Sequence, residues 1–301
     1  MIVREIPSTF QLFFVMQGSV VPKIIWKVVG VAALSFIVIS VDKYVFRLPG
    51  LSISAMGVFG LAISLFLGFR NNAAYERWWE ARKLWGGMIA DVRTLGRFLC
   101  IFANDESTRE KILSCAVAFV HLHRGNLRGV NVNDSVSGWV GKEKAVAMAA
   151  FKSPADAALR SMADQIKTAI SKGEISDVGQ LRISEIVSSL GLHQASCERI
   201  ATAPLPYVYS LLVRRTTYIY CWLLPFGLID STDWFAPLIT SVVAYVFFGL
   251  LEITHELELP FKDVQNGLPL DAMCRTIEIS VLEALGKPTP DNLSPINYVL
   301  K

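Results

Sequence analysis

Two long apolar blocks stand out in the chain, one before residue 70 and one between residues 205 and 253. In the first block, residues 24–41 are apolar apart from Lys27 and two serines, and residues 51–69 contain only small serines as polar members. A helix rises 1.5 Å per residue, so about 18 residues cross roughly 27 Å, close to the thickness of a bilayer core. The pattern predicts two transmembrane helices within residues 24–69, joined by a short linker.

The second block predicts two further spans within residues 205–253. The third span is expected to begin near Arg214 and Arg215 and to contain Pro225. Residues 234–253 then form a run that is apolar before Glu252 except for Thr240 and Ser241. Acidic residues Asp233 and Glu252 lie at or near the ends of this run, as expected where a helix meets water.

Residues 70–204, between the blocks, carry most of the charge. Apolar residues recur there at three- and four-residue spacing, as at Leu95, Phe98, Leu99 and Phe102, which is typical of amphipathic helices. Clusters of Gly, Asn, Asp and Ser predict breaks within residues 125–141 and 172–177. The fold class expected is an all-α membrane protein with four transmembrane helices and a helical region outside the bilayer.

The positive charges predict the orientation. Residues 230–233, between the third and fourth spans, contain no Lys or Arg, whereas arginines flank the central region on both sides. Cytoplasmic loops carry the excess of Lys and Arg, although Lys43 and Arg47 in the first linker weigh against this orientation. The expected segments are cytoplasmic 1–23, membrane 24–69, cytoplasmic 70–204, membrane 205–253 and cytoplasmic 254–301.

Composition agrees with a membrane protein and narrows the chemistry. The chain is 52% hydrophobic and 18% charged, with a mean hydropathy of +0.43, which is more apolar than soluble domains. A net charge of +3 without a long Lys/Arg run gives no reason to expect a nucleic-acid partner. The cysteines are odd in number and scattered, and are predicted to be buried thiols in a reducing compartment: Cys100, Cys115, Cys197, Cys221 and Cys274.

No motif predicts an enzyme, a cofactor or a metal site. His121 and His123 are two residues apart, so on a helix they point in different directions. His255 and Glu256 begin an HExxH pattern, but Leu259 stands where the second histidine belongs. The chain has no GxSxG, P-loop or GxGxxG segment.

A stripe of residues on the second predicted span has two readings. Five positions share i, i+4 spacing and form one narrow line: Ile53, Gly57, Leu61, Leu65 and Phe69. The stripe either packs against another helix or lines a pore. Small residues close to it, such as Gly60, Ala62 and Gly68, favour close helix approach in an oligomer.

Several segments resemble the bestrophin family, especially its bacterial members. The resemblance is carried by residues 66–71 (FLGFRN), Tyr75 with residues 76–82 (ERWWEAR), residues 198–200 (ERI) leading into 204–206 (PLP), residues 256–261 (ELELPF) and residues 268–274 (LPLDAMC). These segments follow one another in order over nearly the whole chain.

The resemblance implies a homopentamer of four-span subunits around one pore in the bacterial inner membrane, with further copies of the chain, lipids and monovalent ions as partners. It places a hydrophobic neck at Leu61, Leu65 and Phe69 and a second, cytoplasmic constriction at Val178. A neck of this kind gates by dewetting, because apolar rings do not replace an ion's hydration. Arg70, with Asn71 or Asn72, would then lie below the neck and tune ion sign.

The family implies passive conduction of an anion such as chloride, with a cation such as sodium as the alternative in bacterial members. Animal members follow the Pro-Phe turn with a run of acidic residues that clamps calcium, whereas residues 262–267 offer only Asp263. Calcium activation is therefore not expected. The competing hypothesis is a membrane scaffold or sensor without conductance, in which the stripe serves packing alone.

Overall fold

The computed structural model describes residues 1–3, 15, 16 and 18–301. Residues 4–14 and 17 of the predicted N-terminal segment lie outside the described residues. The described residues form two compact units: the first contains residues 1–3, Trp79–Ala203 and Pro260–Lys301, and the second contains the described residues between 15 and 78 and Pro204–Leu259. The described residues form helices and a few isolated β-bridges but no strand, which confirms the all-α class for them.

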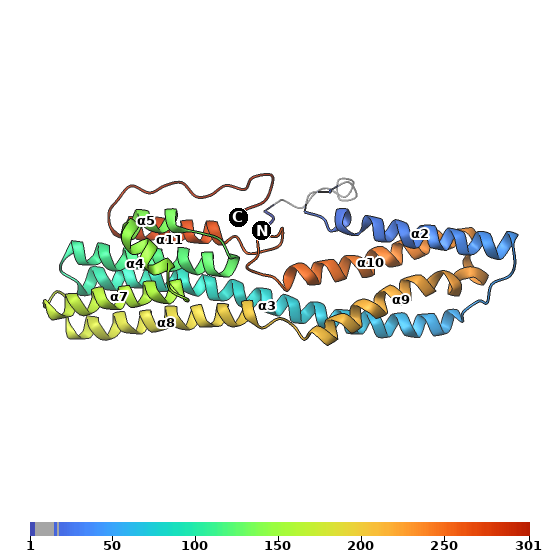
Figure 1. Ribbon diagram of the computed structural model, residues 1–301, viewed down its shortest axis with the longest axis horizontal. Helices are drawn as coiled ribbons and strands as arrows, with labels where there is room; N and C mark the ends of the chain where they lie inside the picture. The colour runs from blue at the N-terminus through green and yellow to red at the C-terminus, as the bar shows by residue number, and fades with distance from the viewer. Residues whose placement is uncertain (4–14, 17) are drawn as a thin grey trace. The chain divides into compact units, whose positions relative to one another are not determined.

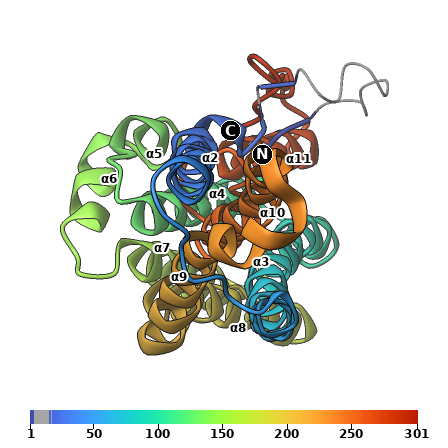
Figure 2. The same ribbon diagram turned by 90° about the vertical axis from the view of Figure 1, so that its right-hand side faces the viewer.

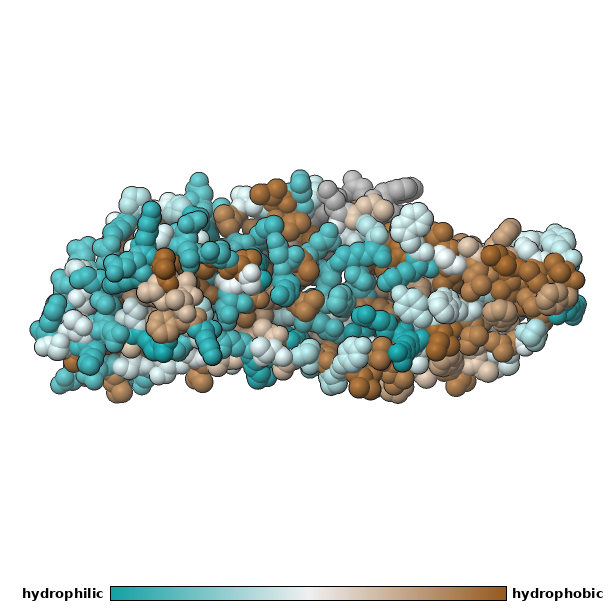
Figure 3. Space-filling view, viewed as in Figure 1, coloured by the Kyte–Doolittle hydropathy of each residue, from teal (hydrophilic) through white to brown (hydrophobic). Residues whose placement is uncertain are grey.

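The second unit is built from apolar helices. Its members are α2 (Val21–Tyr44), the first part of α3 (Ile53–Phe102), α9 (Tyr207–Thr232), the short 3-10 helix η1 (Asp233–Phe235) and α10 (Ala236–Leu257). Helices α2, α9 and α10 pack against one another, as Figures 1 and 2 show. The surface of these helices is largely hydrophobic in Figure 3, which is the composition expected of a lipid-facing surface.

Within the part of the chain that the structure describes, three helical stretches are long and apolar enough to cross a membrane: Val21–Tyr44, Ile53–Phe102 and Tyr207–Leu257. The third stretch contains both α9 and α10, which are separated by η1. The chain therefore has the helices of a membrane protein.

Ion pairs join α2 to both ends of α10 within this unit. Near one end, Lys43 pairs with Asp233 and its ammonium lies 5.1 Å from the ring centroid of Trp234. At the other end, Lys23 pairs with Glu256 and lies 3.4 Å from Glu252. The pairs are partly exposed, and they connect the ends of the two helices.

The first unit is arranged around α4 (Glu106–Arg128), which packs against α5 (Asn133–Val140), α7 (Pro154–Ser171), α8 (Asp177–Thr202) and α11 (Leu270–Ala284). The remaining helix, α6 (Lys142–Ala149), packs against α5 and α7. Helix α4 begins where the Asp105 carboxylate accepts a 2.8 Å hydrogen bond from the Thr108 N–H, and it ends at Gly129, whose φ is 70°. These caps delimit a helix that is buried along most of its length.

One face of α3 is buried along the whole helix. Its buried positions alternate between three- and four-residue spacing, which keeps them on one side. In the second unit they are Met56, Gly60, Ile63, Leu67, Arg70 and Ala74, and in the first unit they include Ala81, Trp85, Met88, Val92, Leu95 and Leu99. Arg70 is the one charged residue among these positions.

Both predicted breaks are confirmed, and one detail of the prediction is wrong. The breaks after Arg128 and after Ser171 fall within the predicted intervals. Helix α3 continues without interruption through the polar segment after residue 69 to Phe102. Cys100 is exposed, whereas the other four cysteines are buried as predicted; it follows Leu99 on α3 and so turns away from the buried face.

Two isoleucines test the description of the core of the first unit. Ile112 on α4 is fully buried, and Ile101 on α3 is 68% exposed. We expect Ile112→Ala to lower the free energy of unfolding by about 2–5 kcal/mol, because it leaves a cavity. The matched control Ile101→Ala should change it by less than about 0.5 kcal/mol. Thermal unfolding of the purified protein measures both, and equal shifts would contradict this assignment of the core.

Candidate functional site

The stripe of α3 faces away from the core of its unit. Leu61, Leu65 and Phe69 are 74%, 58% and 61% exposed, and Ile53 and Gly57 on the same line are also exposed. The stripe therefore does not pack against α2, α9 or α10 of the same chain. Three large apolar side chains in a row are left for lipid, another copy of the chain or a pore.

The opposite face of α3 packs closely on α9. The ring of Phe59 meets Tyr220 edge-on at 5.7 Å between centroids. A Cβ at Gly60 would lie 2.6 Å from the Tyr220 hydroxyl, and one at Gly227 would lie 2.8 Å from the side chain of Met56. Gly60 and Gly227 thus permit α3 and α9 to approach each other closely, as expected where small residues lie between membrane helices. Gly57 and Gly68 have open space beside them and do not take part in this contact.

Arg70 lies on the packed face, next to Phe69 but turned inward. Its side chain is 1% exposed, and its Nη2 donates a 2.6 Å hydrogen bond to Oε1 of Glu258. The backbone carbonyl of Glu258 also accepts a 3.0 Å bond from Nε of Arg77. The interpretation that placed Arg70 below the neck to tune ion sign is wrong for this chain, since successive helical residues are turned by about 100°.

The neighbouring asparagines divide between the two faces of α3. Asn71 is half-buried, and its Oδ1 accepts a 3.3 Å bond from the Thr254 hydroxyl of α10. Asn72 is exposed and donates to Glu76 at 3.1 Å. Of Arg70, Asn71 and Asn72, Asn72 is therefore the residue whose side chain is exposed.

Val178 lies in the first turn of α8 and is 62% exposed. The turn before it is well defined: the Ser176 hydroxyl accepts a 3.2 Å bond from the Gly179 N–H, and Ile175 forms a bridge with Ala103. This cap holds Val178 at the start of the helix with its side chain outward. Val178 belongs to the first unit and the stripe to the second.

The two histidines of α4 have unrelated surroundings. His121 Nε2 lies 2.8 Å from Oε1 of Glu278 on α11. His123 is stacked between the rings of Trp85 and Phe119, and burial lowers its pKa to about 3. Among the described residues, no three His, Cys, Asp or Glu side chains come together in a metal-binding group.

Helix α11 is attached to α4 through charged contacts. Asp271 accepts bonds from Arg124 at 2.5 Å and from Arg128 at 2.7 Å. The Glu278 carboxylate is in contact with His121 and also lies 3.0 Å from Arg275. Burial alone would raise the pKa of Glu278, but its bond to His121 and the nearby positive charges outweigh this effect and lower that pKa.

Asp263, the one carboxylate of the turn after Pro260 and Phe261, is already paired. It accepts a 3.0 Å bond from Nζ of Lys301. This hydrogen bond, against the opposing effect of partial burial, lowers the pKa of Asp263. A single carboxylate with an ammonium partner is a poor calcium ligand set, because calcium takes six to eight oxygens.

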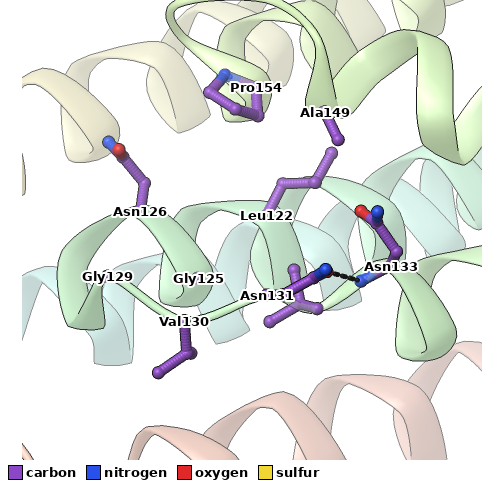
Figure 4. Close-up of a pocket in the computed structure, with 10 residues that line it drawn as sticks. Leu122, Gly125, Asn126, Gly129, Val130, Asn131, Asn133, Ala149 and Pro154 are labelled. Atoms are coloured by element: carbon purple, nitrogen blue, oxygen red, sulfur yellow. Dashed lines mark hydrogen bonds between the residues drawn. The ribbon is translucent and has the colours of Figure 1, made fainter.

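A cavity of about 430 Å³ lies between the end of α4 and the starts of α5 and α7. Figure 4 shows amide side chains of Asn126, Asn131 and Asn133 around it, with Leu122 and Pro154. The Asn131 Oδ1 accepts a 2.9 Å bond from the Asn133 N–H, which shapes the turn. The residues that line the cavity are uncharged, so their amide groups could form hydrogen bonds with a bound molecule but not ion pairs.

The family model described as Bacterial/Fungal Bestrophin protein matches residues 1–283 of this chain. The chain belongs to the bestrophin family. A voltage-dependent anion channel-forming protein of Mesorhizobium japonicum is 42% identical over 97% of this chain and 95% of its own length. The voltage-dependent anion channel-forming protein YneE of Escherichia coli K12 is 33% identical over 94% of this chain and 93% of its own.

The fold of this bestrophin is also similar to that of solved structures. The crystal structure of a bacterial bestrophin homolog from Klebsiella pneumoniae has a TM-score of 0.84 and 32% identity, and the match covers 88% of this chain and 99% of that one. The likeness therefore extends over both compact units.

Sequence reasoning missed the partner of Arg70 in this bestrophin. Arg70 and Glu258 are 188 residues apart, so no local pattern joins them. The spacing of Ile63, Leu67, Arg70 and Ala74 was a usable signal, because it places the arginine in an otherwise apolar line.

The lowered pKa of Glu278 predicts an acid-dependent contribution to stability. A carboxyl whose pKa is lower in the folded state stabilises the fold above its unfolded pKa, and the contribution is lost as pH falls through the folded pKa. We expect Glu278→Gln to lower the melting temperature at pH 7 and to weaken its dependence on pH between about 5 and 3. Glu110→Gln, which removes an exposed partner of Lys287, is the control; identical pH profiles for Glu278→Gln and wild type would contradict the assignment.

Proposed function

We propose that this bestrophin is the subunit of a homopentameric channel in the bacterial inner membrane that passes monovalent ions passively. The observation that carries the proposal is the outward stripe of α3. A helix that packs on one face and is apolar on the other can line a pore on a symmetry axis shared by several copies. Family membership and the printed names of the relatives support conduction as the activity.

Four crossings are the topology we propose, with α2, α3, α9 and α10 each spanning the bilayer. Helices α2, α9 and α10 have 24, 26 and 22 residues, or roughly 33–39 Å at 1.5 Å per residue. The turn at η1 carries Asp233 and Trp234, residue types that favour the membrane–water interface. With the central region and termini in the cytoplasm, the segments are those bounded at residues 23, 69, 204 and 253.

The neck in this proposal consists of Leu61, Leu65 and Phe69 from each copy. Because residues four apart lie one turn apart along a helix, the copies would stack three apolar rings along the axis. Such rings give an ion no substitute for its water, so a narrow neck empties and blocks while a wider one conducts. Val178, outward at the start of α8, would supply a second apolar ring on the cytoplasmic side.

We propose an anion such as chloride as the permeant ion. The neck is uncharged and does not set the sign of the ion, and the relatives are named as anion channel-forming proteins. A cation such as sodium is the alternative. The reversal potential across a salt gradient separates the two.

Planar-bilayer recording of the purified protein tests the proposal. We expect wild type to conduct and both Leu61→Ala and Phe69→Ala to raise the conductance severalfold, because shorter side chains widen and wet the neck. Leu238→Ala is the matched control, since Leu238 on α10 is similarly exposed at 63% but lies off the stripe.

Two outcomes would count against the channel or its neck. Silence from well-folded wild-type oligomers would contradict conduction and favour a scaffold or sensor. Equal conductance in wild type, the two stripe variants and the Leu238→Ala control would leave the channel but remove the neck from Leu61 and Phe69.

A further inference from the structure

Helix α3 is apolar on two opposite sides within the second unit. The packed side carries Met56, Ile63 and Leu67, and the open side carries Leu61, Leu65 and Phe69. Lipid tails are as apolar as leucine, so apolar burial alone gives little preference for one side over the other in a membrane. The fit of Gly60 against Tyr220 favours the observed side, and a polar contact on that side would add to this preference.

Arg70 is the charged residue that distinguishes the two sides. It occupies a packed position of the series Ile63, Leu67, Arg70 and Ala74, and its hydrogen-bonded partner Glu258 follows directly after α10. A rotation that brought the stripe inward would carry the guanidinium away from Glu258. A single polar residue in an apolar helix seam is a known means of specifying register.

The cost of the pair indicates that stability is not its main contribution. Nε and Nη1 of Arg70 are buried and have no hydrogen-bond partner among the described residues. Buried donors without partners are unfavourable, and apolar residues of similar size often replace a buried ion pair with no loss of stability. A costly pair at a packed position is better explained by a role in selecting one arrangement of the helices.

Glu258 is a fixed acceptor. The preceding turn of α10 is held by the pairing of Glu256 with Lys23 of α2, and the Glu258 carbonyl accepts a bond from Arg77. The carboxylate that meets Arg70 is thus attached to the α2–α10 pair.

We propose that the Arg70–Glu258 pair sets the rotation of α3 and thereby decides which side of the helix becomes the wall of the pore. Arg70 is a positioning residue, because it acts through Phe69 and Leu65 rather than by meeting the ion. This assignment deepens the proposed channel function, and its consequence for conduction rests on that function. The rotation itself can be tested without conduction.

Cysteine labelling measures the rotation directly. In a Cys100→Ser background, which removes the exposed native thiol, single cysteines replace Phe69 or Leu67, which are 61% and 0% exposed. A charged, water-soluble thiol reagent is applied to the full-length protein in lipid nanodiscs. Position 69 should label much faster than position 67.

Replacing both Arg70 and Glu258 with Met should reduce the ratio of the two labelling rates about tenfold, which equals about 1.4 kcal/mol of lost preference. Arg199→Met with Glu80→Met is the matched control, because it removes an exposed Arg–Glu pair that also ends on α3. The melting temperature of the Arg70/Glu258 double variant should not fall. If that variant fails to assemble, Glu258→Gln, which keeps the shape of the side chain, replaces it in the same assay.

An unchanged ratio in the Arg70/Glu258 variant would overturn the proposal, as would a wild-type background in which position 69 does not label faster than position 67. Recording the same variants in bilayers separates this inference from the channel function. Wild-type conduction with an unchanged ratio would leave the channel and remove the role of Arg70. A reduced ratio without conduction in wild type would keep the role of Arg70 in α3 and remove the channel.

Discussion

The alternation of three- and four-residue steps on α3 is the constraint on which the second unit depends. It places Met56, Ile63 and Leu67 on one side of the helix, against the apolar core, and leaves Leu61, Leu65 and Phe69 on another. Close packing on α9 then requires glycine at positions 60 and 227, because a Cβ there would meet Tyr220 or Met56. The open stripe is therefore a consequence of how the helix packs, and it is the feature from which a pore wall can be built.

A few ion pairs connect the helices of the second unit. Lys43 with Asp233, and Lys23 with Glu252 and Glu256, connect α2 to opposite ends of α10. Arg70 differs from these because it is almost fully buried and two of its donors have no partner among the described residues. Since a charge in an apolar environment is costly, each pair restricts how the helices can be arranged. The helices are thus assembled by apolar packing and aligned by a few ionic contacts.

The first unit uses the same principle in a polar setting. Helix α4 is buried along most of its length and includes His123, held between two aromatic rings. Asp271 and Glu278 attach α11 to α4 through arginine and histidine partners. Val178 is exposed at the capped start of α8. A bestrophin of this kind thus presents apolar side chains outward in both units, from helices whose other faces are firmly packed.

The sequence by itself determined the helices, the apolar stretches, the stripe and the family, because periodicity, composition and short motifs are local properties. It also located the breaks after Arg128 and Ser171. Only the tertiary structure decided that the stripe is open, that Arg70 turns inward to Glu258, and that Cys100 is exposed. The reason is physical: α3 is apolar on both sides, so its pattern permits more than one rotation, and the contact that selects one joins residues 188 positions apart.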